Sequence, residues 1–289
     1  MRACIVRRLK MKTSFIFRFL MLTLMLTGVV VTCHAQNVSE EGLVIYYSFN
    51  EDTQDGDDVT DVSGNGNDGF LHGSDLQIVS GKVGGCMQFP GDAAQYISVR
   101  EHMYADPFAE ITLATWVKTS VRGMVASWDR SEFFRFAVGD DVGGNNGTTF
   151  VAFDTCCPCC HDWFGKTDVA DDEWHHIAAT FDGTMKRIYV DGKLDDEIEA
   201  PAEVIGAGQA RFGFIGIGSE AGAFDANVGP TWAYNGFLDE FLLFHRPLSA
   251  DEIAHLATGP DDPFVDATTS VEPTDKLSTT WGALKSTYR

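Results

Sequence analysis

From Leu43 onward, short runs of apolar, β-branched and aromatic residues alternate with clusters of Gly, Asn and Asp. Runs such as ITLATWVK (111–118) have the length and residue types of β-strands, and clusters such as DVSGNGNDG (61–69) are typical of the turns between them. The pattern predicts further strands within residues 43–49, 95–99, 124–128, 133–138, 148–153, 175–181, 187–190, 212–218 and 236–245.

Two local signals add detail to this pattern. Asp191-Gly192 stands between two alternating runs, which predicts a tight β-hairpin turn. One segment, LSADEIAHLATG, is typical of a helix, with Ser249 as N-cap, Glu252 completing a capping box and Gly259 after its end. Many short strands with one short C-terminal helix predict an all-β chain folded as a two-sheet antiparallel β-sandwich.

The first 35 residues have the composition of a secretory signal peptide. Basic residues precede the apolar run 19–31, and Cys33-His34-Ala35 is an acceptable cleavage site. Translation starts at Met1 or at Met11, and an uncleaved N-terminal anchor is the alternative. We therefore expect a secreted, extracellular or cell-surface protein whose mature chain has no membrane span.

Net charge narrows the range of partners. The chain has a formal charge of −21, and loss of residues 1–35, which hold six basic and no acidic residues, shifts it to −27. Such a surface repels phosphate backbones and anionic lipids, so we expect no nucleic-acid partner. The charge favours solubility and tolerates divalent cations. After Gly259 the composition turns to Pro, Asp, Thr and Ser, which predicts a linker and short tail over 260–289.

Several segments in order resemble the laminin-G-like, concanavalin A-like lectin-glucanase jellyroll family. The most specific are EWHHIAATFDG (173–183), IYVDG (188–192) and NGFLDEFLLFHRPLSADEI (235–253). The resemblance implies one jellyroll β-sandwich domain over 36–259. It also implies a module that binds an extracellular glycan or surface protein, although some relatives with the wider fold are glycoside hydrolases.

The segment DVSGNG has the spacing of a calcium-binding loop. Asp61, Ser63 and Asn65 alternate before Gly66, which would direct successive oxygens at one Ca²⁺. One short loop supplies too few ligands. In the resembled fold the last strand runs near this loop, which implies carboxylates from Asp239 or Glu240, and Asn50 adds an amide oxygen. The six residues together predict a structural calcium site, and a simple Asx-type turn is the alternative.

A catalytic site is not predicted. Glycoside hydrolases of this fold need paired carboxylates on one strand face, and the nearest candidates are the alternating Asp195, Glu197 and Glu199. These residues have the pattern of a solvated edge strand instead. His175 and His176 are adjacent, so on a strand they face opposite sides and cannot chelate one ion. A glycoside-active enzyme and a purely structural surface protein remain the alternatives to a binding module.

Aromatic residues near loops are candidates for stacking on sugar rings, since loops on a rigid sandwich are common recognition surfaces. The alternative is that these rings close the ends of the sandwich. The candidates are Trp128, Trp163, Phe164, Trp232 and Tyr234.

The segment FDTCCPCCHDWF (153–164) concentrates cysteines on one predicted loop. In an exported chain we expect disulfides among Cys86, Cys156, Cys157, Cys159 and Cys160, and one thiol is left over because five is odd. A metal site, supported by His161 and Asp162, is the less favoured alternative because the four clustered thiols are too close to surround one ion.

Overall fold

A computed structural model of the chain describes residues 37–129, 132–139, 147–156, 161–201, 204–218, 221–222 and 232–264. The predicted signal peptide, most of the predicted linker and tail, and Cys157, Cys159 and Cys160 lie outside these residues. Within the described part, no helix is long and apolar enough to cross a bilayer.

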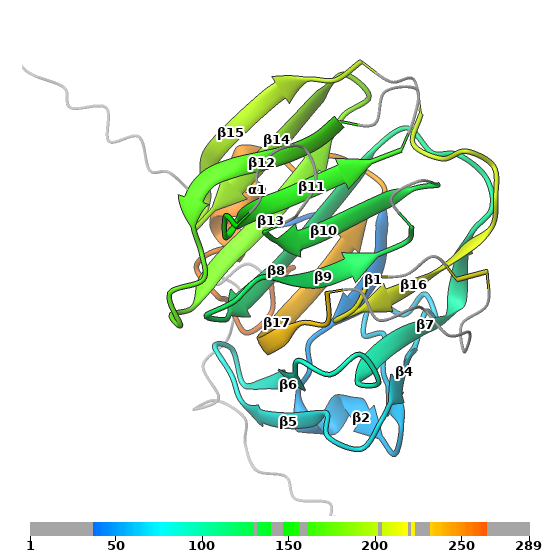
Figure 1. Cartoon of the computed structure of the whole chain (residues 1–289), viewed down its shortest axis with the longest axis vertical. Helices are drawn as coiled ribbons and strands as arrows, with labels where there is room; N and C mark the ends of the chain where they lie inside the picture. The colour runs from blue at the N-terminus through cyan, green and yellow to red at the C-terminus, as the bar shows by residue number, and fades with distance from the viewer. Residues whose placement is uncertain are drawn as a thin grey trace, which may run out of the picture. The chain divides into compact units, whose positions relative to one another are not determined.

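Two antiparallel sheets form the domain, as the strand pattern predicted (Figure 1). The first contains eight strands, seven of which follow one path. In order, they are β15 (Lys193–Glu199), β14 (Met185–Val190), β13 (His175–Phe181), β8 (Ile111–Lys118), β17 (Asn235–Phe244), β6 (Gly85–Pro90) and β5 (Gln77–Ser80). The eighth, β1 (Leu43–Tyr47), pairs with β17. The β14–β15 hairpin turns at Asp191 and Gly192, both with positive φ, so this predicted turn is confirmed.

The second sheet contains nine strands. In order, they are β12 (His161–Asp168), β11 (Phe150–Thr155), β10 (Phe134–Val138), β9 (Gly123–Ser127), β16 (Arg211–Ile215), β7 (Tyr96–Tyr104), β4 (Gly69–His72), β3 (Asp58–Val59) and β2 (Gln54–Asp55). A 3-10 turn, η1 (Glu51–Thr53), precedes β2. The short strands β2, β3, β4 and β5 were not predicted, because two to four residues are too few for a period-2 pattern to stand out. The longer strands β6 and β12 were not predicted either, and the segment 153–164, expected to be one loop, contains the end of β11 and the start of β12.

Alternation along the strands builds the main core between the sheets. On β10, Phe134, Phe136 and Val138 face inward and are fully buried, whereas Arg135 and Ala137 belong to the outer face. On β11, Val151 and Phe153 face the core in the same way. Since side chains alternate across a strand, each inward aromatic places a neighbouring side chain on the outer face of the nine-stranded sheet.

The helix α1 (Ala250–Leu256) covers the outer face of the eight-stranded sheet. Ser249 and Glu252 form the predicted capping box, and Ile253 and Leu256 pack against Ala178, Tyr189 and other residues of that face. One sandwich face is thus closed by the chain itself. On the outer face of the nine-stranded sheet, Met124, Ala137, Ala152 and Phe164 form a smaller buried cluster against which Trp232 packs.

The long strand β17 has two partners in series along one side. Its first half pairs with β6 over 235–238, and its second half pairs with β1 over 241–244. Asp239 and Glu240 lie between these two pairings, at a register shift where Glu240 has a φ of 53°. This bulge interrupts the usual alternation and buries two consecutive carboxylates.

Candidate functional site

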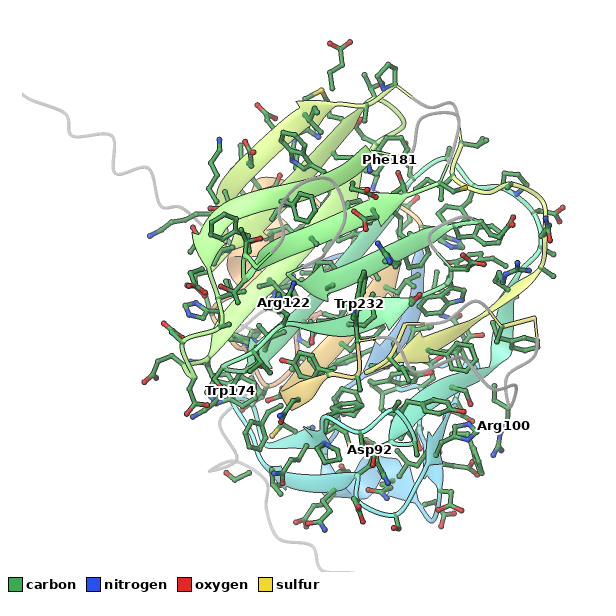
Figure 2. All side chains as sticks on the ribbon, viewed as in Figure 1. Asp92, Arg100, Arg122, Trp174, Phe181 and Trp232 are labelled. Carbon is green, nitrogen blue, oxygen red and sulfur yellow. The ribbon has the colours of Figure 1, made fainter. Side chains whose placement is uncertain are left out.

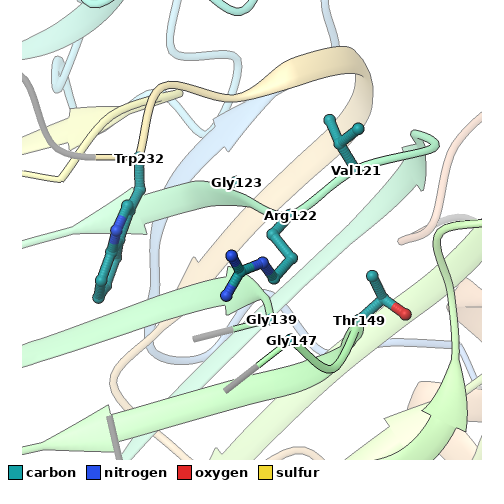
Figure 3. Close-up of a pocket in the computed structure, with 7 residues that line it drawn as sticks. All are labelled: Val121, Arg122, Gly123, Gly139, Gly147, Thr149 and Trp232. Atoms are coloured by element: carbon teal, nitrogen blue, oxygen red, sulfur yellow. The ribbon is translucent and has the colours of Figure 1, made fainter. Parts of the chain in front are cut away.

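A cleft of about 420 Å³ opens at the outer face of the nine-stranded sheet, where β9 begins, β10 ends and β11 begins (Figure 3). Its described lining consists of Val121, Arg122, Gly123, Gly139, Gly147, Thr149 and Trp232. Three of the seven are glycines, so much of the wall is backbone. A partly apolar hollow with a few polar groups is the usual form of a small-molecule site.

Trp232 forms one wall of the cleft from an unusual backbone position. Its φ is 59°, in the left-handed region that a bulky residue rarely adopts, and its carbonyl accepts a hydrogen bond from Met124 N at 2.8 Å. The ring packs on a small apolar cluster that includes Ala137, Ala152 and Phe164. Strained positions of this kind cluster at functional sites, so the placement of this ring is a reason to examine the cleft.

An ion pair lies beneath the Trp232 ring. The Arg135 guanidinium is 4.7 Å from the ring centroid, and its Nη2 and Nε donate to Asp154 Oδ2 at 2.7 and 3.2 Å. Arg135 and Asp154 are directly opposite each other on β10 and β11, and Asp154 is 1% exposed. This buried pair, with its cation against the indole face, fixes the orientation of Trp232.

Arg122 extends along the cleft from the segment before β9. A Cβ at position 139 would lie 2.5 Å from Arg122 Cγ, so the stem of Arg122 crosses the space that a side chain at Gly139 would fill. Figure 3 shows its guanidinium directed toward the side where Trp232 lies. Across the cleft, the Thr149 hydroxyl donates to Asp168 at 2.6 Å and keeps its lone pairs for a ligand.

Of the five predicted aromatic residues, one lines the cleft. Trp232 is partly exposed, and Phe164, 7% exposed, lies beneath it in the same outer cluster. Trp128 and Tyr234 are buried in the main core, and Trp163 packs against that core from β12. These three rings close the sandwich, the alternative raised for all five, because each falls on the inward side of its strand or turn.

The predicted calcium residues divide into two groups. The Asp61 carboxylate accepts three backbone N–H groups, from Tyr46, Ser63 and Asn67, at 2.9 to 3.1 Å. Ser63 Oγ and Asn65 Nδ2 donate to carbonyl oxygens of β1. The Asp61 carboxylate and the Ser63 hydroxyl already accept hydrogen bonds from backbone N–H groups, and Asn65 contacts β1 through its Nδ2. The three side chains thus fasten the loop to the first strand, and a role for them as calcium ligands stays a prediction.

The other three candidates lie at or near the bulge in β17, where the partner of this strand changes from β6 to β1. Asp239 Oδ2 accepts Lys82 N and Val83 N at 2.8 and 2.9 Å, and Asn50 Oδ1 accepts Gly85 N in the same turn. Glu240 accepts a hydrogen bond from the Tyr46 hydroxyl. The second carboxylate oxygen of each acid, Asp239 Oδ1 and Glu240 Oε1, is buried without a hydrogen-bond partner.

Burial governs the charge of these two acids. Burial raises the pKa of Asp239 to about 7, against the opposing effect of its backbone hydrogen bonds. Burial raises the pKa of Glu240 to about 8, and the negative charges of Asp239, Asp262 and Asp261 add to the rise. Among the described residues, no group of three His, Cys, Asp or Glu side chains has metal-binding geometry, so a cation here would need amide, backbone or water oxygens as well.

The acidic residues of β15 are engaged in structural contacts. Asp195 accepts Lys166 N, Thr167 N and the Thr167 hydroxyl of β12, which ties the edges of the two sheets together. Glu197 pairs with Arg187. β15 is an edge strand on which Glu197 and Glu199 are exposed, as expected, whereas Asp195 is half-buried by its contacts with β12. A bulge between Ile188 and Tyr189 breaks the alternation that the sequence pattern suggested.

The two described cysteines do not form a pair. Cys86 is a free, buried thiol on β6 of the eight-stranded sheet, and burial raises its pKa to about 12. Cys156 is buried at the end of β11 in the other sheet, where its thiol donates to the Glu132 carbonyl. The expectation that Cys86 forms a disulfide is wrong, because its thiol is free and lies on the eight-stranded sheet, whereas Cys156 ends β11 of the nine-stranded sheet. Pairing within 156–160 stays a prediction.

Sequence reasoning missed Arg122, Arg135, Thr149 and Asp154. A signal was present for two of them: Arg135 interrupts the apolar run FFRFAV and Asp154 ends VAFD. A charged residue within an apolar strand marks the outer face, yet the pairing of these two across β10 and β11 required the register. Arg122 lies in ordinary turn sequence, and Thr149 lies near the start of the predicted strand 148–153, so neither gave a signal of a site.

Comparisons with known proteins add to this geometry. A family model described as the concanavalin A-like lectin/glucanases superfamily (Laminin_G_3) matches residues 91–254, more than half of the chain. No curated protein matches. Solved structures share the fold at low sequence identity.

The binding domain of Paraclostridial Mosquitocidal Protein 1 is 14% identical with a TM-score of 0.56 over 75% of this chain, which spans 52% of that structure. Domain 4 of AbnA, an extracellular arabinanase from Geobacillus stearothermophilus solved with arabinotriose, is 17% identical with a TM-score of 0.56 over 76% of this chain and all of that domain. A structure of botulinum neurotoxin type C, described as entering cells through two ganglioside molecules, is 14% identical with a TM-score of 0.53 over 76% of this chain and 51% of its own.

Proposed function

We propose, from the premise that this chain belongs to the concanavalin A-like lectin/glucanase superfamily, that it is a non-catalytic module that binds an extracellular glycan. The observation that carries the proposal is the cleft walled by Trp232 on the outer face of the nine-stranded sheet. The printed descriptions of similar solved structures, one a complex with arabinotriose and another naming gangliosides, support a sugar ligand.

The physical argument starts with the indole ring. Sugars present faces of C–H groups that pack on aromatic rings, and a ring held in place before binding loses little conformational entropy on binding. Trp232 is held by its backbone hydrogen bond and by Arg135 beneath it. The cleft volume of about 420 Å³ is within the usual range for small-ligand sites, so it suits a short saccharide segment.

A glycan array probed with the purified chain tests this proposal. We expect specific hits that fall about tenfold in affinity in Trp232→Ala, which corresponds to about 1.4 kcal/mol, because the variant loses the apolar surface that a sugar face would cover. Trp174→Ala is the matched control, because Trp174 packs on Phe237 away from the cleft lining. Its variant should bind as the parent does.

Two other results would each favour another class of function. Specific capture of a surface protein, with no array hits, would favour a structural surface protein. Release of reducing sugar from the same polysaccharides, lost in Glu197→Gln and Glu199→Gln, would make the chain an enzyme.

We also propose that a structural Ca²⁺ is held at the bulge in β17 formed by Asp239 and Glu240. Asp239 and Glu240 each have one buried oxygen without a partner, and Asn50 lies on the same turn as Asp239. A hollow lined by Asn50 and by Tyr46, whose hydroxyl binds Glu240, offers further oxygens from Ser48, Ser63, Asp261 and Asp262. Two ionised carboxylates in a buried position need a compensating cation, and Ca²⁺ prefers carboxylate, amide and carbonyl oxygens.

Melting with and without chelator tests the calcium proposal. At pH 8.5 we expect the parent to melt several degrees higher in millimolar Ca²⁺ than in EDTA, and Asp239→Asn to lose this difference. Asp61→Ala should lower the melting temperature equally in both buffers, because Asp61 binds backbone N–H groups instead. A parent whose melting is the same in both buffers contradicts the proposal.

The pH dependence gives the same test a second readout. In EDTA, the contribution of Asp239 and Glu240 to the free energy of unfolding should be most favourable below about pH 4. It should fall as the pH rises toward 7 to 8. The reason is that both pKa values are raised in the folded state, so ionisation is opposed there and not in the unfolded chain.

A further inference from the structure

We propose that the Ca²⁺ at the bulge in β17 also draws in residues 260–264, here called the strap, and so fastens the segment after α1 to the first strand. This inference rests on the proposed calcium site. It gives that site two further ligands, Asp261 and Asp262, and a regulatory role, because the strap leads from the domain toward residues 265–289.

The strap lies against β1 and the residues before it. The Pro263 carbonyl accepts a hydrogen bond from Val38 N at 3.3 Å, and the Phe264 ring meets the Tyr46 ring edge-on, with 5.8 Å between the centroids. No residue of the strap belongs to a described strand or helix. Its attachment therefore depends on a ring contact and a long backbone hydrogen bond, and segments held in this way open locally at a low cost in free energy.

The strap brings negative charge to a place that is already acidic. Asp261 and Asp262 line the same hollow, of about 600 Å³, as Glu40 and Asp52, and its described lining contains no lysine or arginine. The negative charges of Asp261 and Asp262 contribute to the raised pKa of the buried Glu240, so both carboxylates are within electrostatic reach of the bulge. Without a cation, the strap is therefore repelled by the carboxylates that it faces.

Oxygen ligands are available both at the bulge and on the strap. At the bulge, Asp239 Oδ1 and Glu240 Oε1 are buried without hydrogen-bond partners. On the strap, Asp261 and Asp262 are exposed, and the bond from Phe264 N, 2.9 Å long, engages only the Oδ1 atom of Asp262. Ca²⁺ takes about six to eight oxygens, more than the bulge provides, so ligands from the strap would help to complete its shell.

Calcium binding requires the strap to move inward. In the described part of the chain, no three acidic, histidine or cysteine side chains are arranged to hold a metal ion, so the acids of the bulge and of the strap do not yet converge. A cation shared between them replaces repulsion by attraction, and only the closed position of the strap offers it the full set of ligands. Binding therefore shifts the strap toward the closed position.

Amide hydrogen exchange on the purified full chain tests this shift. Two amides report on the strap: Val38 N, which donates to the Pro263 carbonyl, and Phe264 N, which donates to Asp262. We expect both to exchange about fivefold or more slowly in about 5 mM Ca²⁺ than in EGTA, since extracellular calcium modules have dissociation constants of about 0.1–1 mM. The EGTA sample is matched in ionic strength with NaCl, so that screening is the same in both.

Substitutions on the strap separate its role from that of the bulge. Asp262→Asn keeps a hydrogen-bond acceptor for Phe264 N and removes the charge, so it should reduce the effect of calcium on both amides. The double variant with Asp261→Asn should abolish the effect. In EGTA the double variant should exchange more slowly than the parent, because the repulsion is relieved.

Asp92→Asn is the matched control and should respond to calcium as the parent does. Asp92, labelled in Figure 2, is an exposed residue that follows β6 and lies outside the lining of the hollow. Its Oδ1 accepts Ala94 N, two residues ahead, at 2.8 Å, which is the same local contact that Asp262 makes with Phe264.

Calcium calorimetry on the same samples distinguishes the two proposals. Calcium that binds without slowing exchange at Val38 and Phe264 overturns the strap inference and leaves the calcium site at the bulge standing, and this comparison uses the parent alone. The same conclusion follows if the double variant, folded as judged by its melting temperature, keeps the full effect. An absence of calcium binding overturns the calcium proposal itself, and the strap inference with it.

Discussion

At the scale of single residues, the cleft depends on backbone positions that most side chains disfavour. Trp232 and Gly139 both have positive φ, the first at some energetic cost and the second with none. The backbone of Trp232 places its indole ring over Arg135. The missing side chain at Gly139 leaves room for the Arg122 stem to cross the end of β10. The shape of the cleft is thus determined as much by main-chain conformation as by side-chain chemistry.

Gly139→Ala tests this dependence. A Cβ at 139 would collide with the Thr148 carbonyl and the Arg122 stem, so we expect a loss of about 2 kcal/mol or more in unfolding free energy, together with weaker ligand binding. The measurement is urea denaturation combined with the glycan assay.

Gly147→Ala is the matched control for that variant. It also has a positive φ, 91°, and it lines the same cleft, yet nothing lies within 4 Å of an added Cβ. We expect only the conformational cost, about 1 kcal/mol. Equal losses in the two variants would show that crowding at position 139 is unimportant.

At the scale of elements, the helix α1 is stabilised both by a local cap and by contacts with residues far away in the sequence. The capping box was predicted from Ser249 and Glu252, but Glu252 also binds Arg246 at 2.7 Å, which in turn donates to the Ser39 and Glu41 carbonyls. The cap therefore joins the helix to the N-terminal segment of the domain. Burial alone would raise the pKa of Glu252, and the hydrogen bonds from Arg246 and Ser249 outweigh it and lower the pKa to about 2.

This junction gives an acid-sensitive prediction. Because the pKa of Glu252 is lower in the folded state, its stabilising contribution is complete above about pH 5 and is lost as pH falls toward 2. Ser249→Ala should cost about 1 kcal/mol at pH 7, measured by chemical denaturation. The cost of Glu252→Gln should be larger at pH 7 than at pH 2.5, and a cost independent of pH would contradict this account.

At the scale of the whole molecule, the two outer faces of the sandwich differ. Helix α1 covers the eight-stranded sheet, whereas the nine-stranded sheet has the cleft beside Trp232 at its outer face. The proposed ligand site is therefore placed on the nine-stranded sheet.

Mass spectrometry of the protein recovered from its native medium tests export and cysteine pairing together. We expect an N-terminus near Gln36 and, on reduction, a mass gain that corresponds to at least one disulfide within 156–160. Cys86 should be alkylated only after denaturation, since it is a buried free thiol. Retention of residues 1–35 would favour the uncleaved N-terminal anchor over the signal peptide. Five free thiols would favour a metal site at the cysteine cluster over a disulfide.

The sequence by itself determined the class of fold, the hairpin at Asp191-Gly192 and the capped helix, because these depend on local periodicity and turn chemistry. It also included Trp232 among the predicted sugar-stacking residues and Asp239 and Glu240 among the predicted calcium ligands. Other members of those two sets proved to be core or turn residues. Only the tertiary structure decided which oxygens were already bound, which aromatic faced outward, and that Arg122 lies across from Trp232. Those outcomes depend on strand register and on a bulge, and both are set by contacts between residues far apart in the chain.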